Sequence, residues 1–313
     1  MVWSVSTAKT FERCQRQWFY KTQFASAKAK DEARRFAYLL GKLQSVSAWR
    51  GNLVDHVLSH QVIPAIGRGE AISAEKATAS AMDRFDRQLA VGRQHRIHEP
   101  GFKPSALGED FAAFYAMEYG DGISDEVIGQ ARDEVRAAII AFFAMDKLIQ
   151  RLSQARRLIT QRHLFFTLAG VKVRAVPDVI VLSTETPPAI IDWKVHTFGR
   201  HDAWLQLAIY AAALTRTDSR LDYQIATNGF DPTDVGLLEV QLLTQVLRRH
   251  RLSEDDLERA ESYAARTSEA MALALGEATE KTSELSPDSF PAARFASTCE
   301  TCPYRCLCWE TLQ

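Results

Sequence analysis

The chain has 313 residues and a formal net charge of −1, with 46% hydrophobic and 25% charged residues. This composition is typical of a folded globular protein and excludes a disordered or fibrous one. No apolar run approaches the roughly 20 residues needed to span a bilayer, and the opening Met-Val-Trp-Ser lacks the features of a secretion signal. We therefore expect a cytoplasmic protein with no membrane partner, built as one integrated domain.

Basic side chains are concentrated in two segments, although the chain is nearly neutral overall. The first segment covers residues 13–42, and the second is Arg248-Arg249-His250-Arg251. Such patches can follow the phosphates of a nucleic acid. They are equally expected on solvated helix faces, so charge alone does not choose between the two interpretations.

Helical spacing of apolar residues predicts that the first half of the chain, residues 1–156, is helical. Ser6 is placed to cap a helix that carries Phe11, Cys14, Trp18 and Phe19. Further helices are predicted over residues 31–47, 53–66, 74–89 and 125–150. Residues 101–108, which include a proline and two glycines, are predicted to form a loop.

Strand patterns begin after Arg157 and define a second region, residues 157–250. Strands are predicted over residues 158–168, 171–176, 179–182, 189–193, 223–227 and 235–241, with a tight turn at 169–170 and a helix over 202–214. A long amphipathic helix over 253–278 begins the third region, residues 251–313. This order predicts an α/β fold in which a mixed sheet carries a large helical extension.

Two acidic residues and a lysine stand on adjoining predicted strands. They occur in Pro177-Asp178 and in Ile190-Ile191-Asp192-Trp193-Lys194. Carboxylates bind hard divalent cations such as Mg²⁺ or Mn²⁺, which activate water and offset phosphate charge. Asp192 and Lys194 are two positions apart and so share one face of a strand, where the lysine can position the attacking water.

A single Asp-x-Lys is common on ordinary strands, so the surrounding sequence decides its meaning. The helix that follows carries Gln206 and Tyr210 at positions i and i+4, hence on one face. The residues between them are apolar and can pack on the sheet.

Taken in order, these residues resemble the RecB-like branch of the PD-(D/E)XK nucleases, which includes AddB nuclease domains and CRISPR-associated exonucleases. The resemblance implies a restriction-endonuclease-like core with Asp178 and Asp192 as Mg²⁺ or Mn²⁺ ligands and Lys194 as the catalytic lysine. It implies that Gln206 and Tyr210 support the lysine or contact DNA. It covers both ends of the chain and residues 157–227, and leaves residues 67–150 without a match.

The family usually places a metal-binding histidine in a helix four residues after a glycine. Here that spacing from Gly51 leads to Asp55, and His56 comes one residue later. Adjacent helical residues lie about 100° apart, so both cannot point equally well at one metal. We expect His56 or, as the alternative, Asp55 to be the third ligand. The glutamate often found before the first catalytic aspartate is also missing, and Gln161 stands near its place.

Four of the five cysteines, Cys299, Cys302, Cys306 and Cys308, lie within the last 15 residues. In a reducing compartment such clustering indicates metal ligation rather than disulfides. Thiolates at this spacing suit zinc or an iron–sulfur cluster, and the four could form a purely local site.

The cysteines also resemble the iron–sulfur variant of the same family, which has one cysteine in an N-terminal helix and Cys-x-x-Cys-x5-Cys near the C-terminus. The resemblance implies a 4Fe-4S cluster on Cys14, Cys299, Cys302 and Cys308, with Cys306 as an extra thiol and zinc as the alternative. Phe11, Trp18, Tyr304 and Trp309 are expected to shield it. Gln15 stands where that family usually has proline.

These patterns together predict a metal-dependent deoxyribonuclease that acts on DNA ends or single strands, in repair, recombination or anti-phage and CRISPR-type defence. The chain lacks a Gly-x-x-x-x-Gly-Lys-Ser/Thr phosphate loop, so a separate helicase or defence-system protein is the expected partner. The alternatives are an inactive DNA-binding protein of the same fold and a zinc-binding scaffold.

Overall fold

The computed structural model describes residues 2–120, 122–168, 170–195, 203–217, 229–276 and 285–310. The chain falls into two compact units, each drawn from three separate stretches. Unit 1 comprises Met1–Val5, Arg50–Asp83 and Gly129–Arg266, and unit 2 comprises Ser6–Trp49, Arg84–Ile128 and Thr267–Gln313. The sequence-based division after residues 156 and 250 follows motifs rather than contacts, and it stays a prediction.

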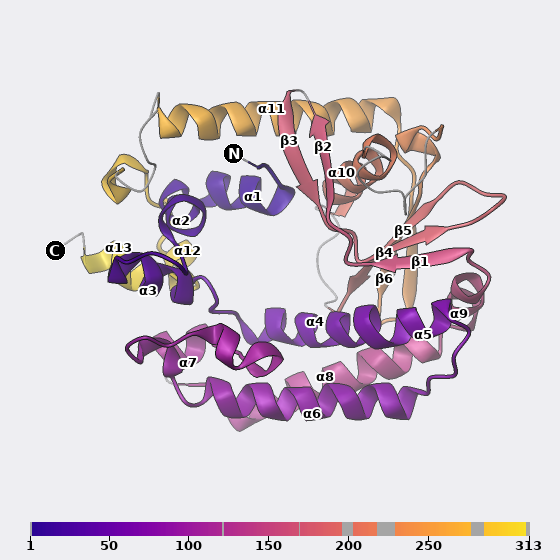
Figure 1. Ribbon diagram of the computed structural model, residues 1–313, viewed down its shortest axis with the longest axis horizontal. Coiled ribbons are helices and arrows are strands. Elements are labelled where there is room, and N and C mark those ends of the chain that lie inside the picture. The colour runs from indigo at the N-terminus through magenta and orange to yellow at the C-terminus, as the bar shows by residue number, and fades with distance from the viewer. Residues whose placement is uncertain are drawn as a thin grey trace. The chain divides into compact units, whose positions relative to one another are not determined.

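A five-stranded mixed sheet organises unit 1 (Figure 1). Its spatial order is β1-β4-β5-β6-β7, with bounds β1 Arg157–Thr160, β4 Val179–Leu182, β5 Ala189–Lys194, β6 Gly236–Gln241 and β7 Val246–His250. The β5–β6 pair is parallel and the other three pairs are antiparallel. The predicted α/β fold with a mixed sheet is confirmed. β7 had been assigned only as a basic patch, and the predicted strand over 223–227 lies outside the described residues.

Helices cover both faces of the central strands, which explains why β4 and β5 read as nearly continuous apolar runs. On one face Trp193 packs edge-on against Phe142 of helix α8 (Asp125–Phe143), with ring centroids 5.7 Å apart. Helix α10 (Ala203–Arg216) contacts β5 and β6 and also the β2–β3 hairpin. It lies in the connection between β5 and β6, because parallel neighbours need a crossover.

A separate hairpin joins β2 (Leu164–Leu168) to β3 (Val171–Ala175). Trp3 pairs with β3, since its amide donates to Lys172 O and its carbonyl accepts from Arg174 N, both at 2.8 Å. The single strand predicted over 158–168 is therefore wrong: β1 and β2 belong to different sheets. The chain breaks at Gln161, whose φ of +49° ends the first strand.

Helices of 5 to 22 residues complete unit 1, and several contribute residues to both units. They are α4 Val46–Val57, π-helical η2 Leu58–Val62, α5 Ile63–Gly67, α6 Ala74–Gly92, α9 Asp146–Ser153 and α11 Glu254–Leu275, besides α8 and α10. The helices predicted over 53–66 and 125–150 are interrupted, the first by a π turn and the second between α8 and α9. No helix of the described ranges is long and apolar enough to cross a membrane.

Unit 2 consists of short helices around an aromatic core. They are α1 Val5–Arg13, α2 Gln15–Phe19, π-helical η1 Tyr20–Phe24, α3 Glu32–Leu40, α7 Tyr115–Tyr119, α12 Ala296–Glu300 and α13 Arg305–Glu310, with 3-10 turns at Arg96–His98, Pro104–Ala106, Gly108–Asp110 and Pro287–Ser289. Phe19 stacks on Phe290 with centroids 4.3 Å apart, and Tyr20 stacks on Tyr304 at 5.5 Å. The core thus joins residues from near the two ends of the chain.

Candidate active site

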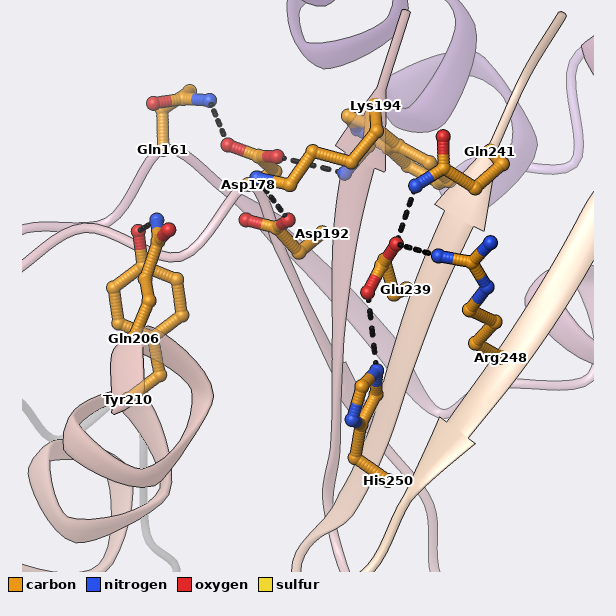
Figure 2. A network of polar contacts seen from close by, with 11 residues as sticks. Gln161, Asp178, Asp192, Lys194, Gln206, Tyr210, Glu239, Gln241, Arg248 and His250 are labelled. Atoms are coloured by element: carbon orange, nitrogen blue, oxygen red, sulfur yellow. Dashed lines mark hydrogen bonds and ion pairs between the residues drawn. The ribbon is translucent and has the colours of Figure 1, made fainter. Parts of the chain in front are cut away.

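Strand pairing brings the two predicted aspartates together. Asp178 immediately precedes β4, and the pairing of Val179 with Ile191 sets it beside Asp192 on β5. The backbone N–H of Trp193 donates to Asp178 Oδ2 at 2.9 Å. Lys194 Nζ lies 2.5 Å from Asp192 Oδ2 (Figure 2). Asp178, Asp192 and Lys194 therefore form one cluster.

The charges of this cluster oppose and compensate one another. Burial raises the pKa of Asp178 well above its usual range, and repulsion from Asp192 and Asp55 adds to the rise. Burial alone would lower the pKa of the Lys194 ammonium, but the charge and hydrogen bond of Asp192, together with the charges of Asp178 and Glu239, outweigh burial and raise that pKa. The lysine is thus held in its charged form beside carboxylates that repel one another.

A third carboxylate enters from helix α4. Gln161 Nε2 donates to Asp55 Oδ1 at 2.9 Å and to Asp178 Oδ1 at 3.2 Å, so one side-chain amide bridges two acids. Ser59 Oγ also donates to Asp55 Oδ1 at 2.9 Å. His56, by contrast, stacks on His60 with ring centroids 4.4 Å apart. Of the two residues weighed for this position, Asp55 is the one linked to Asp178.

The bridging role of Gln161 follows from an unusual backbone conformation. Its left-handed φ turns the chain out of β1, while its backbone N–H donates to Asp178 O at 3.1 Å. Non-glycine residues adopt this conformation rarely, and such strain often gathers at functional sites. The sequence singles out Gln161 only because it stands near the place of the family's glutamate. No adjacent residue indicates a left-handed backbone conformation.

Gln206 and Tyr210 face the carboxylates from helix α10 (Figure 2). Gln206 Nε2 donates to the Tyr210 hydroxyl at 2.5 Å. The side chain of Tyr210 is buried, and burial together with the nearby charges of Asp192 and Asp178 raises the pKa of its phenol. The i and i+4 spacing thus brings both residues to the same cluster.

A fourth acid, Glu239 on β6, was missed by sequence reasoning. The parallel register places it directly beside Asp192, and it is 1% exposed. Its charge adds to the attraction that raises the pKa of Lys194. The available signal was a single acid inside the apolar run Leu237-Leu238-Glu239-Val240.

The donor set suits a hard divalent cation. Asp55, Asp178 and Asp192 present carboxylate oxygens, the ligands that Mg²⁺ and Mn²⁺ prefer. Their mutual repulsion is a cost that a bound cation would offset. Over the described ranges, no three histidine, cysteine, aspartate or glutamate side chains are arranged to hold a metal ion. Instead, the Gln161 amide bridges Asp55 and Asp178, and the Lys194 ammonium contacts Asp192.

The cysteines form a second group, in unit 2. Burial raises the pKa of the Cys302 thiol to about 12, and the neighbouring thiols Cys14, Cys299 and Cys308 add to the rise. Arg16 Nη1 donates to Cys308 Sγ at 3.7 Å. Cys306 lies against a different partner, Tyr119 Oη, at 3.2 Å.

Three aromatic residues expected around the cysteines, Phe11, Trp18 and Tyr304, lie in the unit 2 core. Trp18 packs edge-on against Phe11 with centroids 5.0 Å apart. Tyr304 is 2% exposed, and the charge of Cys302 acts on its phenol. The side chain of Trp309 lies outside the described part of the structure.

Comparison with known proteins gives a family for this fold and site. A family model described as the PD-(D/E)XK nuclease superfamily matches residues 2–309. Among solved structures, the chain is similar to a candidate exonuclease from Eubacterium rectale, with 13% identity and a TM-score of 0.42 over 93% of this chain and 84% of that one. It is also similar to SSO0001, with 15% identity and a TM-score of 0.30 over 60% of this chain and 79% of that one. No curated protein matches the sequence significantly.

Proposed function

Since this chain belongs to the PD-(D/E)XK nuclease superfamily, we propose that it is a metal-dependent deoxyribonuclease of the RecB-like type, acting on DNA ends or single strands. The observation that carries the proposal is the cluster in which Lys194 contacts Asp192, Asp178 lies beside Asp192, and Gln161 links Asp55 to Asp178. The family generally uses Mg²⁺ or Mn²⁺.

The three aspartates would hold the metal, with Asp55 in the position for which His56 was the first candidate. When bound, the metal supplies positive charge to the phosphate and lowers the pKa of water. Gln161 holds the Asp55 and Asp178 carboxylates next to each other, because its side-chain amide donates to both. The N–H of Trp193 fixes the orientation of the Asp178 carboxylate.

Lys194 is the residue that acts on the reacting atoms. Its ammonium, kept charged by Asp192, can donate hydrogen bonds to the attacking water and to a non-bridging phosphate oxygen. The water oxygen forms a bond to phosphorus as the bond to the leaving ester oxygen breaks; the water gives a proton to bulk solvent, and the leaving oxygen takes a proton from it. Gln206 and Tyr210, on the neighbouring helix, support the lysine or contact the DNA strand.

The cysteine group is proposed to hold a 4Fe-4S cluster on Cys14, Cys299, Cys302 and Cys308. The support is that their thiols influence one another, whereas Cys306 contacts Tyr119. Four thiols are also the ligand number of such clusters. Zinc on the same thiols is the alternative, and metal analysis of anaerobically purified protein distinguishes the two.

The function is tested by digesting end-labelled linear DNA and circular DNA, single- and double-stranded, with added Mg²⁺ or Mn²⁺. We expect metal-dependent release of label from linear single strands, and none in EDTA. The Asp192→Asn protein, purified in parallel, controls for contaminating nucleases and should be inactive. A wild-type protein that cuts none of these substrates, or cuts them as well as Asp192→Asn does, would refute the proposal.

A further inference from the structure

Glu239 is a carboxylate enclosed in the sheet next to the candidate active site. It is 1% exposed and lies on β6, with Asp192 beside it on β5 and Arg248 beside it on β7. An uncompensated charge at such a position would be strongly destabilising. The partners of Glu239 must therefore compensate its charge.

Three side chains converge on this carboxylate (Figure 2). Gln241 Nε2 donates to Glu239 Oε1. Arg248 Nη1 donates to the same oxygen at 3.2 Å, and His250 Nε2 lies 3.1 Å from Oε2. The charge is paired, but stability alone does not require it, since apolar residues of similar volume often replace buried ion pairs without loss.

The contact with Glu239 uses only part of the hydrogen-bonding capacity of Arg248. Its side chain is 30% exposed, and among the described residues its one hydrogen-bonding contact is from Nη1 to Glu239. A guanidinium carries five N–H donors in a rigid fork that matches phosphate geometry. Glu239 thus fixes the side chain while leaving most of its donors available.

The register places these side chains in a row with the catalytic lysine. Lys194 is paired with Gln241, and Asp192 with Glu239, so all four project from one face of the sheet. Arg248 pairs with Glu239 on the same face. β7 is two strands from β5 and ends the strand order, which puts Arg248 about 10 Å from the catalytic strand. A DNA backbone covers that distance within a few nucleotides.

We propose that Arg248, fixed by Glu239, binds a backbone phosphate of the DNA strand being cleaved, so that the strand runs across the sheet from Lys194 toward β7. This inference rests on the proposed nuclease function, because the scissile phosphate sets where the strand begins. It makes Glu239 a positioning residue that acts through Arg248.

The next residue along β7 provides a matched control. Arg249 carries the same charge but projects from the opposite face of the sheet. There it lines a cavity of about 340 Å³ together with Arg151 and Gly236. Removing Arg249 therefore lowers the charge of the strand equally without touching the active-site face.

The test measures binding of a fluorescein-labelled single-stranded oligonucleotide in EDTA, where no cleavage occurs, as a function of salt. Arg248→Gln should raise the Kd about tenfold and reduce the salt slope by about 0.7, the loss of one phosphate contact to a single strand. Arg248→Lys should fall between wild type and Arg248→Gln, because it keeps the charge without the fork. Arg249→Gln should bind as wild type does.

Cleavage measurements separate this inference from the proposed function. Arg248→Gln should raise KM for the oligonucleotide about tenfold more than Arg249→Gln does. KM for bis(p-nitrophenyl) phosphate, a single phosphodiester too short to reach β7, should be similar in the two variants. A wild-type protein that cuts neither substrate refutes the nuclease proposal, while loss of binding specific to Arg248→Gln still supports the contact. Arg248→Gln binding as tightly as wild type, or an equal loss in Arg249→Gln, would overturn the inference.

Discussion

The carboxylate cluster of unit 1 and the cysteine group of unit 2 both gather ligands from distant parts of the chain, but they balance charge differently. Around Asp178 and Asp192 the protein supplies its own donors, the Lys194 ammonium and the Gln161 amide. Around Cys302, burial and the neighbouring thiols raise the pKa, and the one opposing backbone hydrogen bond, at Tyr304, does not cancel that rise. The first site is held in shape by the protein, whereas the second should depend on the group it binds.

The largest effect is expected from breaking the cysteine group. Cys14 and Cys299 stand 285 positions apart, so linking them through one cluster restricts the unfolded chain by on the order of 5 kcal/mol. Cys14→Ala should therefore lose the broad visible absorption of anaerobic protein and lower its Tm markedly. Absorption spectroscopy, iron analysis and thermal unfolding measure both losses.

Cys306→Ala is the control for this prediction and should keep both colour and Tm. Colour that survives in Cys14→Ala but not in Cys306→Ala would favour a local site made by the four C-terminal cysteines. Colourless wild-type protein with stoichiometric zinc would show that the cysteines bind zinc rather than an iron–sulfur cluster. The nuclease proposal would be unaffected.

A large effect on activity is expected at the carboxylate cluster. Lys194→Ala removes the donor to the attacking water and should reduce kcat for DNA cleavage by about 10²–10³-fold. Its Tm should fall as well, because the buried Asp192 loses its ion-pair partner, so kcat is compared at a temperature where the variant is folded. Lys172→Ala, on the β2–β3 hairpin, is the matched control. Equal kcat in the two variants would remove Lys194 from the reaction.

A smaller effect is expected from the bridging amide. Gln161→Ala should weaken Mn²⁺ binding about tenfold, since residues that orient metal ligands typically contribute 10–100-fold to affinity. Calorimetric titration with Mn²⁺ measures this directly. Gln245→Ala controls for the backbone, because Gln245 also has a left-handed φ, +53°, in the turn between β6 and β7. If the Mn²⁺ affinity of Gln161→Ala is unchanged, Gln161 does not orient the metal ligands and serves only the fold.

Local sequence patterns predicted much of the sheet, because apolar runs and alternation report directly on burial. β4, β5 and β6 match the predicted strands within two residues, and Asp178, Asp192 and Lys194 form one cluster as their spacing suggested. The break at Gln161 was not predictable, because tertiary hydrogen bonds to two acids hold a conformation that glutamine does not favour.

Features that depend on contacts between strands were also missed. β7 reads as a basic patch because its two arginines are consecutive and show no apolar–polar alternation, and only the pairing with β6 shows that Arg248 and Arg249 occupy opposite faces. Similarly, a helical wheel cannot choose between Asp55 and His56. The choice came from Gln161, which is 106 positions from Asp55.

The distance along the chain between Cys14 and its partners also has a consequence for synthesis. At about 5–20 residues per second, roughly 15 to 60 s pass between translation of Cys14 and translation of Cys299. During that interval the α1–α2 segment has neither its thiol neighbours nor Phe290, on which Phe19 stacks. Until the C-terminal segment has been made, the α1–α2 segment therefore exposes aromatic side chains and a thiol that the folded protein packs against Phe290 and the other cysteines.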